Sequence, residues 1–585
     1  MTRNLYSSLS AAILLLSMLT ACGGGGPQTA PTQVKVSVNP RTVSLAAGAT
    51  QQFAATVTGT TPTAVIWSLS GCSGSDCGGI DGSGLYTAPT SIPSAATVSV
   101  IAKLQSDSSK TGSATVTPTA NLLRPGDYAF VFSGWKGQGG GAFSRQFLVG
   151  HFPADATGNI TSGVEDMNDA AGVSLSMPIT GTYTVNANHR GTLSIANAQE
   201  TESFSMTVDP TGTKGHLIRQ YNTGSPVSGS GCFEPQDGSA YSSAALAGSY
   251  AMELTAKPDD THSMAAVGRF TVDSNGDISG GEMDMLAPAG SYNQMALGGS
   301  VSAPASDSGR GTASLTLTPQ PGALSGAMQL VYYVISANRV VMMQTDVRGS
   351  AAPLLSGEAQ RQTGTLSLAT FNAPTIFELS GMNTYYQTAY VGQITPDGSG
   401  SMTGVFDQNY ESNALLNQAF SGTYTLDSEG RATLAMLSGT AIAYFYGSNQ
   451  AYLMQQPVAG GDILYGNVKP QTAGPYGPAS LGALRISEPE PVSPFAESDS
   501  GLITFDGVGS ASYEQDYTFF YADGTFIEQS QTGSASYTLD SNGRGVITVG
   551  TYVLPFWLVS SDEVTVIDTA TAGVDYLPVV QHYLK

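Results

Sequence analysis

Oxygen-bearing side chains in tight turns are the residues of this sequence whose types and spacing could support chemistry. Asp273, Asn275 and Asp277 alternate with small residues, and Glu282 follows shortly after them. Carboxylate and amide oxygens are calcium ligands, but the spacing and the closing bidentate Glu of an EF-hand loop are missing. Asp and Asn also favour tight turns for local reasons. The segment is therefore interpreted as a structural turn, with a weak calcium site at Asp273, Asn275 and Asp277 as the alternative.

The sequence carries none of the common catalytic or cofactor motifs. Its five histidines form no metal-ligand pattern, and no His-Glu-x-x-His motif, phosphate-binding glycine loop or Gly-x-Ser-x-Gly elbow occurs. Paired carboxylates of the glycosidase kind remain conceivable, because such residues can meet in space without a sequence signature. We expect no metal site, no cofactor and no catalytic activity.

Composition narrows the fold class and the partners. Only 11% of the residues are charged and 70 are glycine, which argues against long charged helices and favours short strands joined by turns. Hydrophobic residues make up 41%, enough for packed cores. The formal net charge of −22 repels nucleic acid phosphates, so no nucleic acid partner is expected.

The start of the chain has the pattern of an export signal. A polar start with Arg3 precedes an apolar run at 11–16, which is too short for a permanent membrane helix of about 20 residues. The run ends in Leu-Thr-Ala-Cys22, which resembles the lipobox of bacterial lipoproteins. The resemblance implies cleavage before Cys22, acylation of Cys22 and anchoring through lipid. Because Gly23 rather than Asp follows, it favours the outer membrane. An ordinary signal peptide with an incidental cysteine is the alternative.

Two further cysteines lie close together. Cys72 and Cys77 flank four small or polar residues, and in an oxidising compartment we expect them to form a disulfide. A metal site is the alternative, but no histidine lies nearby. Cys232 is left over, and we expect a buried thiol there.

Short alternating apolar and polar runs between 34 and 118 indicate half-buried strands separated by Gly- and Pro-containing turns. The segments VNP at 38–40, GATQQF at 48–53, VIWS at 65–68 and GLYTAP at 84–89 resemble group 2 bacterial Ig-like domains of intimin- and invasin-type surface proteins. The resemblance implies a β-sandwich with Trp67 in its core, and it implies a spacer or adhesion role only loosely, since fold does not fix function.

A two-part phrase recurs four times in the rest of the chain. Its first part is a strand, an Asp-x-x-Gly turn and a second strand, which together predict a hairpin. The turn aspartates are Asp155, Asp273, Asp397 and Asp506. The second part ends in an arginine just after another turn. These arginines are Arg190, Arg310, Arg431 and Arg544, and we interpret them as covering hairpin surface or pairing with a local carboxylate, with a ligand role as the alternative.

Further hairpins bring each repeat to about eight antiparallel strands, which is the number for a small up-and-down barrel; a sandwich is the alternative. The repeats resemble tandem β modules of predicted envelope lipoproteins from soil bacteria such as acidobacteria, a resemblance that implies architecture and little function. The sequence therefore predicts an all-β chain with an N-terminal Ig-like β-sandwich and four tandem antiparallel β modules. The predicted parts are a signal peptide (1–21), a Gly-rich tether (22–33), the Ig-like domain (34–118), repeat 1 (119–237), repeat 2 (238–360), repeat 3 (361–470) and repeat 4 (471–585).

Three functions fit these features. The first is a lipid-anchored cell-envelope protein with a binding, adhesion or structural role, in contact with the membrane through its lipid and with a glycan or surface-protein ligand. The second is a lipocalin-like carrier of small apolar ligands, which requires barrel interiors that side chains do not fill. The third is a polysaccharide-acting enzyme, which requires a cleft with converging carboxylates.

Overall fold

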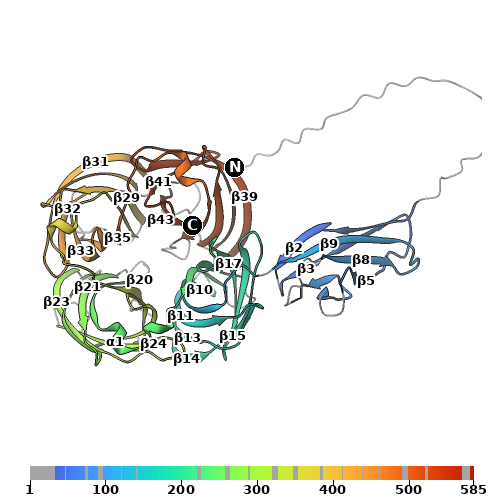
Figure 1. The fold of residues 1–585 in the computed structure, drawn as a ribbon, viewed down its shortest axis with the longest axis horizontal. Coiled ribbons are helices and arrows are strands. Elements are labelled where there is room, and N and C mark those ends of the chain that lie inside the picture. The colour runs from blue at the N-terminus through green and yellow to red at the C-terminus, as the bar shows by residue number, and fades with distance from the viewer. Residues whose placement is uncertain are drawn as a thin grey trace, which may run out of the picture.

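The computed structural model places an N-terminal domain beside a ring of four β modules (Figure 1). It describes residues 33–46, 48–72, 77–89, 97–119, 121–139, 142–169, 171–220, 226–256, 264–287, 290–318, 327–346, 354–382, 387–410, 413–437, 439–456, 462–489, 498–520, 525–569 and 580–585. The predicted signal peptide, Cys22 and nearly all of the tether lie outside these residues. Within them, no helix has the length and apolarity that a membrane crossing requires.

The N-terminal domain consists of three small sheets around one apolar core, in which Phe53 and Tyr86 are fully buried and Trp67 packs half-buried at the edge. Cys72 and Cys77 form a disulfide next to the core, and the Tyr86 hydroxyl donates to the Cys77 carbonyl at 2.9 Å. The strands are β1 (Lys35–Asn39), β2 (Thr42–Ala46), β3 (Thr50–Gln52), β4 (Ala54–Thr58), β5 (Val65–Ser70), β6 (Gly79–Ile80), β7 (Leu85–Thr87), β8 (Val98–Leu104) and β9 (Thr111–Thr119).

Repeats 2, 3 and 4 are closed eight-stranded antiparallel barrels, which decides between the two predicted architectures in favour of the barrel. Repeat 2 contains β20 (Gly248–Ala256), β21 (Met264–Val272), β22 (Asp277–Ala287), β23 (Gly290–Val301), β24 (Arg310–Leu317), β25 (Ala327–Ser336), β26 (Arg339–Gln344) and β27 (Leu355–Arg361). Repeat 3 contains β28 (Thr375–Met382), β29 (Gln387–Pro396), β30 (Ser401–Tyr410), β31 (Asn413–Leu426), β32 (Arg431–Met436), β33 (Gly439–Gly447), β34 (Gln450–Gln456) and β35 (Ile463–Pro470). Repeat 4 contains β36 (Leu484–Pro489), β37 (Ser498–Phe505), β38 (Ser510–Phe520), β39 (Phe526–Leu539), β40 (Arg544–Val549), β41 (Tyr552–Leu558), β42 (Glu563–Ile567) and β43 (Val580–Leu584).

Repeat 1 has the same strand order, but its third and fourth strands are each interrupted, so that it forms a ten-stranded sheet. The pairs β13–β14 and β12–β15 together correspond to the single pair β22–β23 of repeat 2. The strands are β10 (Gly126–Gly139), β11 (Ala142–Ala154), β12 (Asn159–Ile160), β13 (Val164–Asp169), β14 (Gly172–Pro178), β15 (Thr180–Val185), β16 (Arg190–Ala196), β17 (Thr201–Val208), β18 (Gly215–Arg219) and β19 (Val227–Pro235).

The repeated Asp-x-x-Gly turns have one local cause. In repeat 2 the Asp273 carboxylate accepts the backbone N–H groups of Asn275 and Asp277 at 2.8 and 2.9 Å. Gly276 then takes a φ of 93°, a left-handed conformation that favours glycine. The same bonds and the same glycine conformation recur at the turns after Asp155, Asp397 and Asp506.

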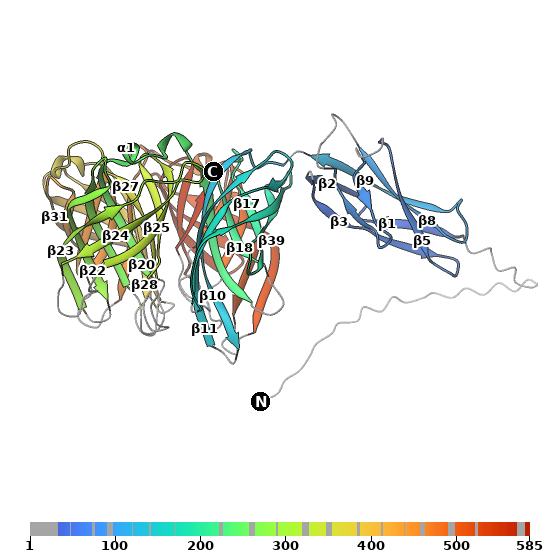
Figure 2. The same ribbon diagram turned by 90° about the horizontal axis from the view of Figure 1, so that it is seen from below.

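A short capping segment before the first strand closes one end of each barrel. Repeat 2 is capped by a 3₁₀ turn (Gly238–Ala240) and α1 (Ser243–Leu246), repeat 3 by a 3₁₀ turn (Leu368–Thr370) and repeat 4 by a 3₁₀ turn (Pro478–Leu481). Each capping segment packs one leucine into the core of its repeat, namely Leu246, Leu366 and Leu481. Figure 2 shows α1 at one end of its barrel, so that end of the ring is the capped face.

The linkers dock each repeat onto the next through a repeated glutamine. The Gln362 side-chain amide donates to the carbonyls of Glu429 and Phe445, both at 2.8 Å. Gln236 and Gln471 make the matching pairs of bonds to repeats 2 and 4. Because each amide satisfies two carbonyls of the following repeat, neighbouring repeats are held in one relative orientation.

The repeated arginines join the repeats across their interfaces, and the prediction of a local carboxylate partner is wrong. Arg431 of repeat 3 binds Asp284 of repeat 2 through Nε and Nη2, both at 2.8 Å, and the Tyr444 hydroxyl donates to the same carboxylate at 2.6 Å. Matching clusters join repeat 2 to repeat 1 and repeat 4 to repeat 3. They are Arg310, Tyr333 and Asp166, and Arg544, Trp557 and Asp407.

The fourth arginine closes the ring. Arg190 of repeat 1 pairs with Asp516 and Glu514 of repeat 4. Asp516 follows the turn Asp of its repeat by ten residues, as Asp407 does, and Asp166 and Asp284 follow theirs by eleven. The hydroxyls of Thr207 and Ser500 meet at 3.0 Å in the same interface, where the other interfaces have a Tyr or Trp donor. The first and last repeats are therefore neighbours, as Figure 1 shows.

Candidate functional site

The interiors of the four repeats differ most clearly at the position just before each interface aspartate. This position holds Glu165, Met283, Phe406 and Gln515 in repeats 1 to 4. Neighbouring residues on a strand point to opposite faces, so this residue points into the barrel while the aspartate points to the next repeat. The substitutions at this position predict that the four interiors are filled in different ways.

Repeat 1 is filled by a buried ionic cluster. Glu165, Glu202 and Arg219 are all at most 1% exposed. Arg219 Nη1 lies 2.6 Å from Glu202 Oε1, and the Asn197 amide donates to Glu165 at 3.0 Å. Burial and the neighbouring Glu202 raise the pKa of the Glu165 carboxyl well above its usual range. Two carboxyl groups therefore converge here, but they lie inside a filled core.

Repeats 2 and 3 are filled by apolar side chains. In repeat 2 Met252, Met283, Met285 and Met295 are at most 1% exposed, and a cavity in this barrel measures only about 40 Å³. In repeat 3 rings occupy the corresponding space. The ring centroids of Tyr390 and Phe406, of Phe406 and Phe420, and of Phe377 and Phe420 are 5.8, 6.0 and 6.2 Å apart.

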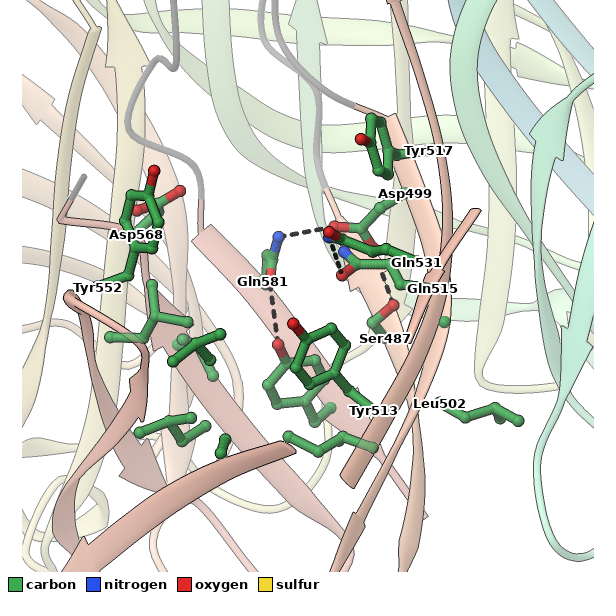
Figure 3. A pocket seen from close by; sticks show the side chains of 18 residues that line it. Ser487, Asp499, Leu502, Tyr513, Gln515, Tyr517, Gln531, Tyr552, Asp568 and Gln581 are labelled. Atoms are coloured by element: carbon green, nitrogen blue, oxygen red, sulfur yellow. Dashed lines mark hydrogen bonds between the residues drawn. The ribbon is translucent and has the colours of Figure 1, made fainter. Parts of the chain in front are cut away.

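Repeat 4 contains a cavity of about 320 Å³ inside its barrel (Figure 3). One part of its wall is polar and consists of Ser487, Asp499, Gln515, Gln531 and Gln581, and Asp568 lies beside Tyr552 across the cavity from Asp499 (Figure 3). Another part is apolar and consists of Ile503, Ala535, Ile547, Val549, Leu554 and Val566. Four tyrosines complete it, namely Tyr513, Tyr517, Tyr552 and Tyr583. The cap at Leu481 closes one end, and Gln531 and Tyr552 are exposed towards the other.

Asp499 is the centre of the polar wall and is 2% exposed. Its carboxylate accepts the Ser487 hydroxyl and the Gln581 amide, both at 2.8 Å. Figure 3 shows Gln581, Asp499 and Gln515 converging on one side of the cavity. Burial raises the pKa of Asp499 to about 6, because the hydrogen bonds it accepts offset only part of the lost hydration.

The lining of the cavity is acidic and contains no basic residue among those described. Asp568 is the second carboxyl of the lining, and its charge raises the pKa of Asp499 further. His582 lies on the opposite face of β43, between Glu378 of repeat 3 at 3.1 Å and Glu563 at 3.4 Å. The site therefore offers hydrogen-bond acceptors, amide groups, tyrosine hydroxyls and an apolar wall to a small molecule.

The residues predicted from the sequence lie elsewhere. Asp273 accepts hydrogen bonds within its own turn, in repeat 2, and in the described part of the chain no group of three or more His, Cys, Asp or Glu is arranged to hold a metal. Cys72 and Cys77 form their disulfide in the N-terminal domain, and Cys232 is half-buried on β19. Sequence reasoning missed the cavity. The available signal was the polar residue Gln515 on β38, at a position where repeats 2 and 3 have Met283 and Phe406.

Comparisons with known proteins add no function. No protein-family model and no curated protein sequence matches the chain. A double mutant of transferrin binding protein B from Haemophilus parasuis matches at 9% identity over 65% of this chain and 84% of that one, with a TM-score of 0.15. A protein of unknown function of the DUF3598 family from Nostoc punctiforme matches at 7% identity over 50% of this chain and 97% of that one, with a TM-score of 0.14. Likenesses at this level carry no information on function.

Proposed function

We propose that this chain is a cell-envelope binding protein whose repeat 4 holds a small ligand inside its barrel. The cavity of about 320 Å³ carries the proposal, because it lies in the range of small-molecule sites and combines an apolar wall with a few convergent polar groups. Eight-stranded barrels are just wide enough either to be filled by side chains or to hold one small ligand. Side chains fill the interiors of repeats 1 to 3, whereas repeat 4 leaves room for a ligand.

The location in the envelope rests on the sequence. The export signal and the lipobox-like segment support acylation of Cys22 and an outer-membrane anchor. The Gly-rich segment after Cys22 and the N-terminal domain would then separate the ring from the membrane surface. In this arrangement the protein presents or retains its ligand at the envelope.

The proposal assigns binding rather than catalysis to the cavity. Asp499 accepts a hydrogen bond on each of its two oxygens, which suits a fixed acceptor better than a nucleophile. The converging pair Glu165 and Glu202 is fully buried, so a polysaccharide has no access to it in the described structure.

A glycan on the surface of the ring is a second candidate ligand. A hollow of about 610 Å³ lies between the N-terminal domain, repeat 1 and repeat 4. Its lining is rich in hydroxyl and amide groups, including Thr50, Thr182, Asn188 and Gln220. The Asn186 side chain accepts the Ala46 N–H at 3.0 Å there and joins the N-terminal domain to repeat 1.

A thermal-shift screen of the mature chain tests the binding proposal. The panel contains neutral sugars, aromatic alcohols, organic amines and carboxylates of low molecular mass. We expect at least one class to raise a melting transition of the wild type, and expect Val549→Phe, which fills the cavity, to abolish that shift. Val508→Phe is the matched control, because Val508 is in repeat 4 but 81% exposed. No stabilisation by any class, or an equal shift in Val549→Phe, would refute the proposal.

A further inference from the structure

We infer that the ligand of repeat 4 is a small organic amine with an apolar body, whose ammonium group is bound by Asp499 in the field of a second carboxylate of the lining, Asp568. The inference rests on the proposed function and names the chemical class of its ligand. It follows from the shape of the cavity, from its charge, and from a comparison of Asp499 with the other buried aspartates of the ring.

The cavity has two chemically distinct parts, which suits a molecule with two distinct ends. The apolar wall offers Ile547, Val549 and Leu554 to a hydrocarbon or ring, whose burial is favourable at roughly 25 cal/mol per Å². The polar wall offers the Asp499 carboxylate to a hydrogen-bond donor, together with the side-chain oxygens of Gln515 and Gln581. These two amide oxygens accept from Gln531 and Tyr583 and have a second lone pair each. An ammonium group carries three donors and no acceptor, so it matches these oxygens.

The interface aspartates show how this chain compensates a buried carboxylate elsewhere. Asp166, Asp284 and Asp407 have side chains with no exposure, and each is bound by an arginine through two N–H groups. Asp499 is equally buried, but Ser487 and Gln581, which donate to it, are neutral. A buried carboxylate without an opposite charge is costly, and a bound cation would supply that charge.

The remaining lining disfavours other ligands. Asp568 adds a second negative charge, and the described lining contains no Lys, Arg or His, so a carboxylate or phosphate ligand would be repelled. Four tyrosines surround the space, and tyrosine rings attract organic cations through their faces. A neutral alcohol would find hydrogen bonds but would bring no positive charge to the Asp499 carboxylate, whose donors Ser487 and Gln581 are neutral.

Binding should depend on pH in a defined direction. The titratable groups that line the cavity around Asp499 are Asp568 after β42, Tyr513 and Tyr517 on β38, Tyr552 on β41, and Tyr583 on β43. Burial raises the pKa of Asp499 to about 6 in the ligand-free protein, so the carboxyl is ionised at pH 7.5 and largely protonated at pH 5. Because only the ionised form attracts an ammonium group, the affinity for an amine should fall as the pH is lowered through 6.

Isothermal titration of the mature chain with three molecules that share one body provides the test. The probes are 4-phenylbutylamine, 4-phenylbutanol and 4-phenylbutyrate, each at pH 7.5 and pH 5. We expect the amine to bind at least ten-fold more tightly than the alcohol at pH 7.5, with the carboxylate weakest. The preference of the protein for the amine over the alcohol should shrink at least five-fold at pH 5. The alcohol and the carboxylate are measured at pH 5 as well, because a general loss of binding would weaken all three probes.

Isosteric variants locate the effect. Asp499→Asn should reduce the amine affinity at least ten-fold and leave the alcohol within three-fold, and Asp568→Asn should act in the same direction if the first variant folds poorly. Asp562→Asn removes the same charge from a side chain that is 69% exposed on the β41–β42 turn and should change nothing. Equal affinities for amine and alcohol, or no binding of the amine, would overturn this inference while any stabilising compound from the screen keeps the proposed function. Failure of both experiments would remove both.

Discussion

Replacing Tyr333 by phenylalanine removes one hydroxyl from the interface between repeats 1 and 2 and leaves the ring in place. The hydroxyl donates to Asp166 Oδ2 at 2.6 Å, and Tyr333 is fully buried. Asp166 keeps its other donors, which are Arg310 through two N–H groups and the Ser176 N–H at 2.8 Å. The variant therefore loses one charge-assisted hydrogen bond without leaving the carboxylate unpaired, which costs about 1.5–3 kcal/mol.

The adjacent residue supplies a matched control. Tyr332 lies on the same strand, β25, and its hydroxyl donates to the Ser302 carbonyl, also at 2.6 Å. Tyr332→Phe removes an equally short bond to a neutral acceptor inside repeat 2, which costs about 0.5–1.5 kcal/mol. The difference in free-energy cost between the two variants therefore measures how much the negative charge of Asp166 strengthens the hydrogen bond at the interface.

Hydrogen exchange measured by mass spectrometry on the whole chain is the suitable assay, because a protein with several modules does not unfold in one two-state step. When exchange is limited by local opening, the predicted losses accelerate the amides of β13 about 10- to 150-fold in Tyr333→Phe. In Tyr332→Phe the amides of β25 should accelerate only about 2- to 10-fold, with β13 unaffected. If Tyr333→Phe left β13 as protected as the wild type, the carboxylate clusters would not be what holds the repeats together.

Three further changes test other parts of the molecule. Although burial opposes its charge, Glu378 and Glu563 raise the pKa of His582 to about 10, so its stabilisation of the contact between repeats 3 and 4 is complete below pH 6.5 and lost as the pH rises through 10. In urea titrations, resistance to unfolding should therefore fall less between pH 7 and pH 10.5 in His582→Gln than in the wild type. An equal fall in both proteins would contradict this. Cys72→Ser should destabilise only the N-terminal domain, by about 2 kcal/mol from loop entropy, seen as faster proteolysis there with unchanged fragments from the ring; uniform destabilisation would contradict it. Cys22→Ser should move the protein from the detergent phase to the aqueous phase of membrane extracts, and membrane retention would exclude a lipid anchor at this residue.

The hairpins could be predicted from sequence because their cause is local. Each turn Asp is bonded to backbone within four residues, and the glycine of the turn needs only its own left-handed conformation. Eight strands per repeat then followed from counting. The cost of exposed sheet edges favours a barrel, but the sequence left a sandwich open, and the structure decides for the barrel in repeats 2 to 4. Repeat 1 departs from that count because two of its strands are interrupted, which its turn pattern does not signal.

The arginines and the cavity could not be predicted, for two different reasons. The distance along the chain from Arg310 to Asp166 is 144 residues, so the partner of each repeated arginine depends on how whole repeats are placed. A usable signal for the arginine partners did exist, because an aspartate follows the turn Asp of each repeat by ten or eleven residues. The cavity is a deficit of volume summed over eight strands, and no single residue such as Gln515 reveals it.

The closure of the ring restricts how such a protein can change. Open repeat arrays can gain or lose units, because each unit contacts only its neighbours. Here Arg190 pairs with Asp516, so an added unit would have to separate the first repeat from the last, and a deleted one would leave two charged surfaces unmatched. Sequence changes that alter ligand binding are therefore confined to the interior positions of single repeats. Alternation along one strand permits this, since Asp516 serves the assembly while its neighbour Gln515 faces the cavity and is free to vary with the ligand.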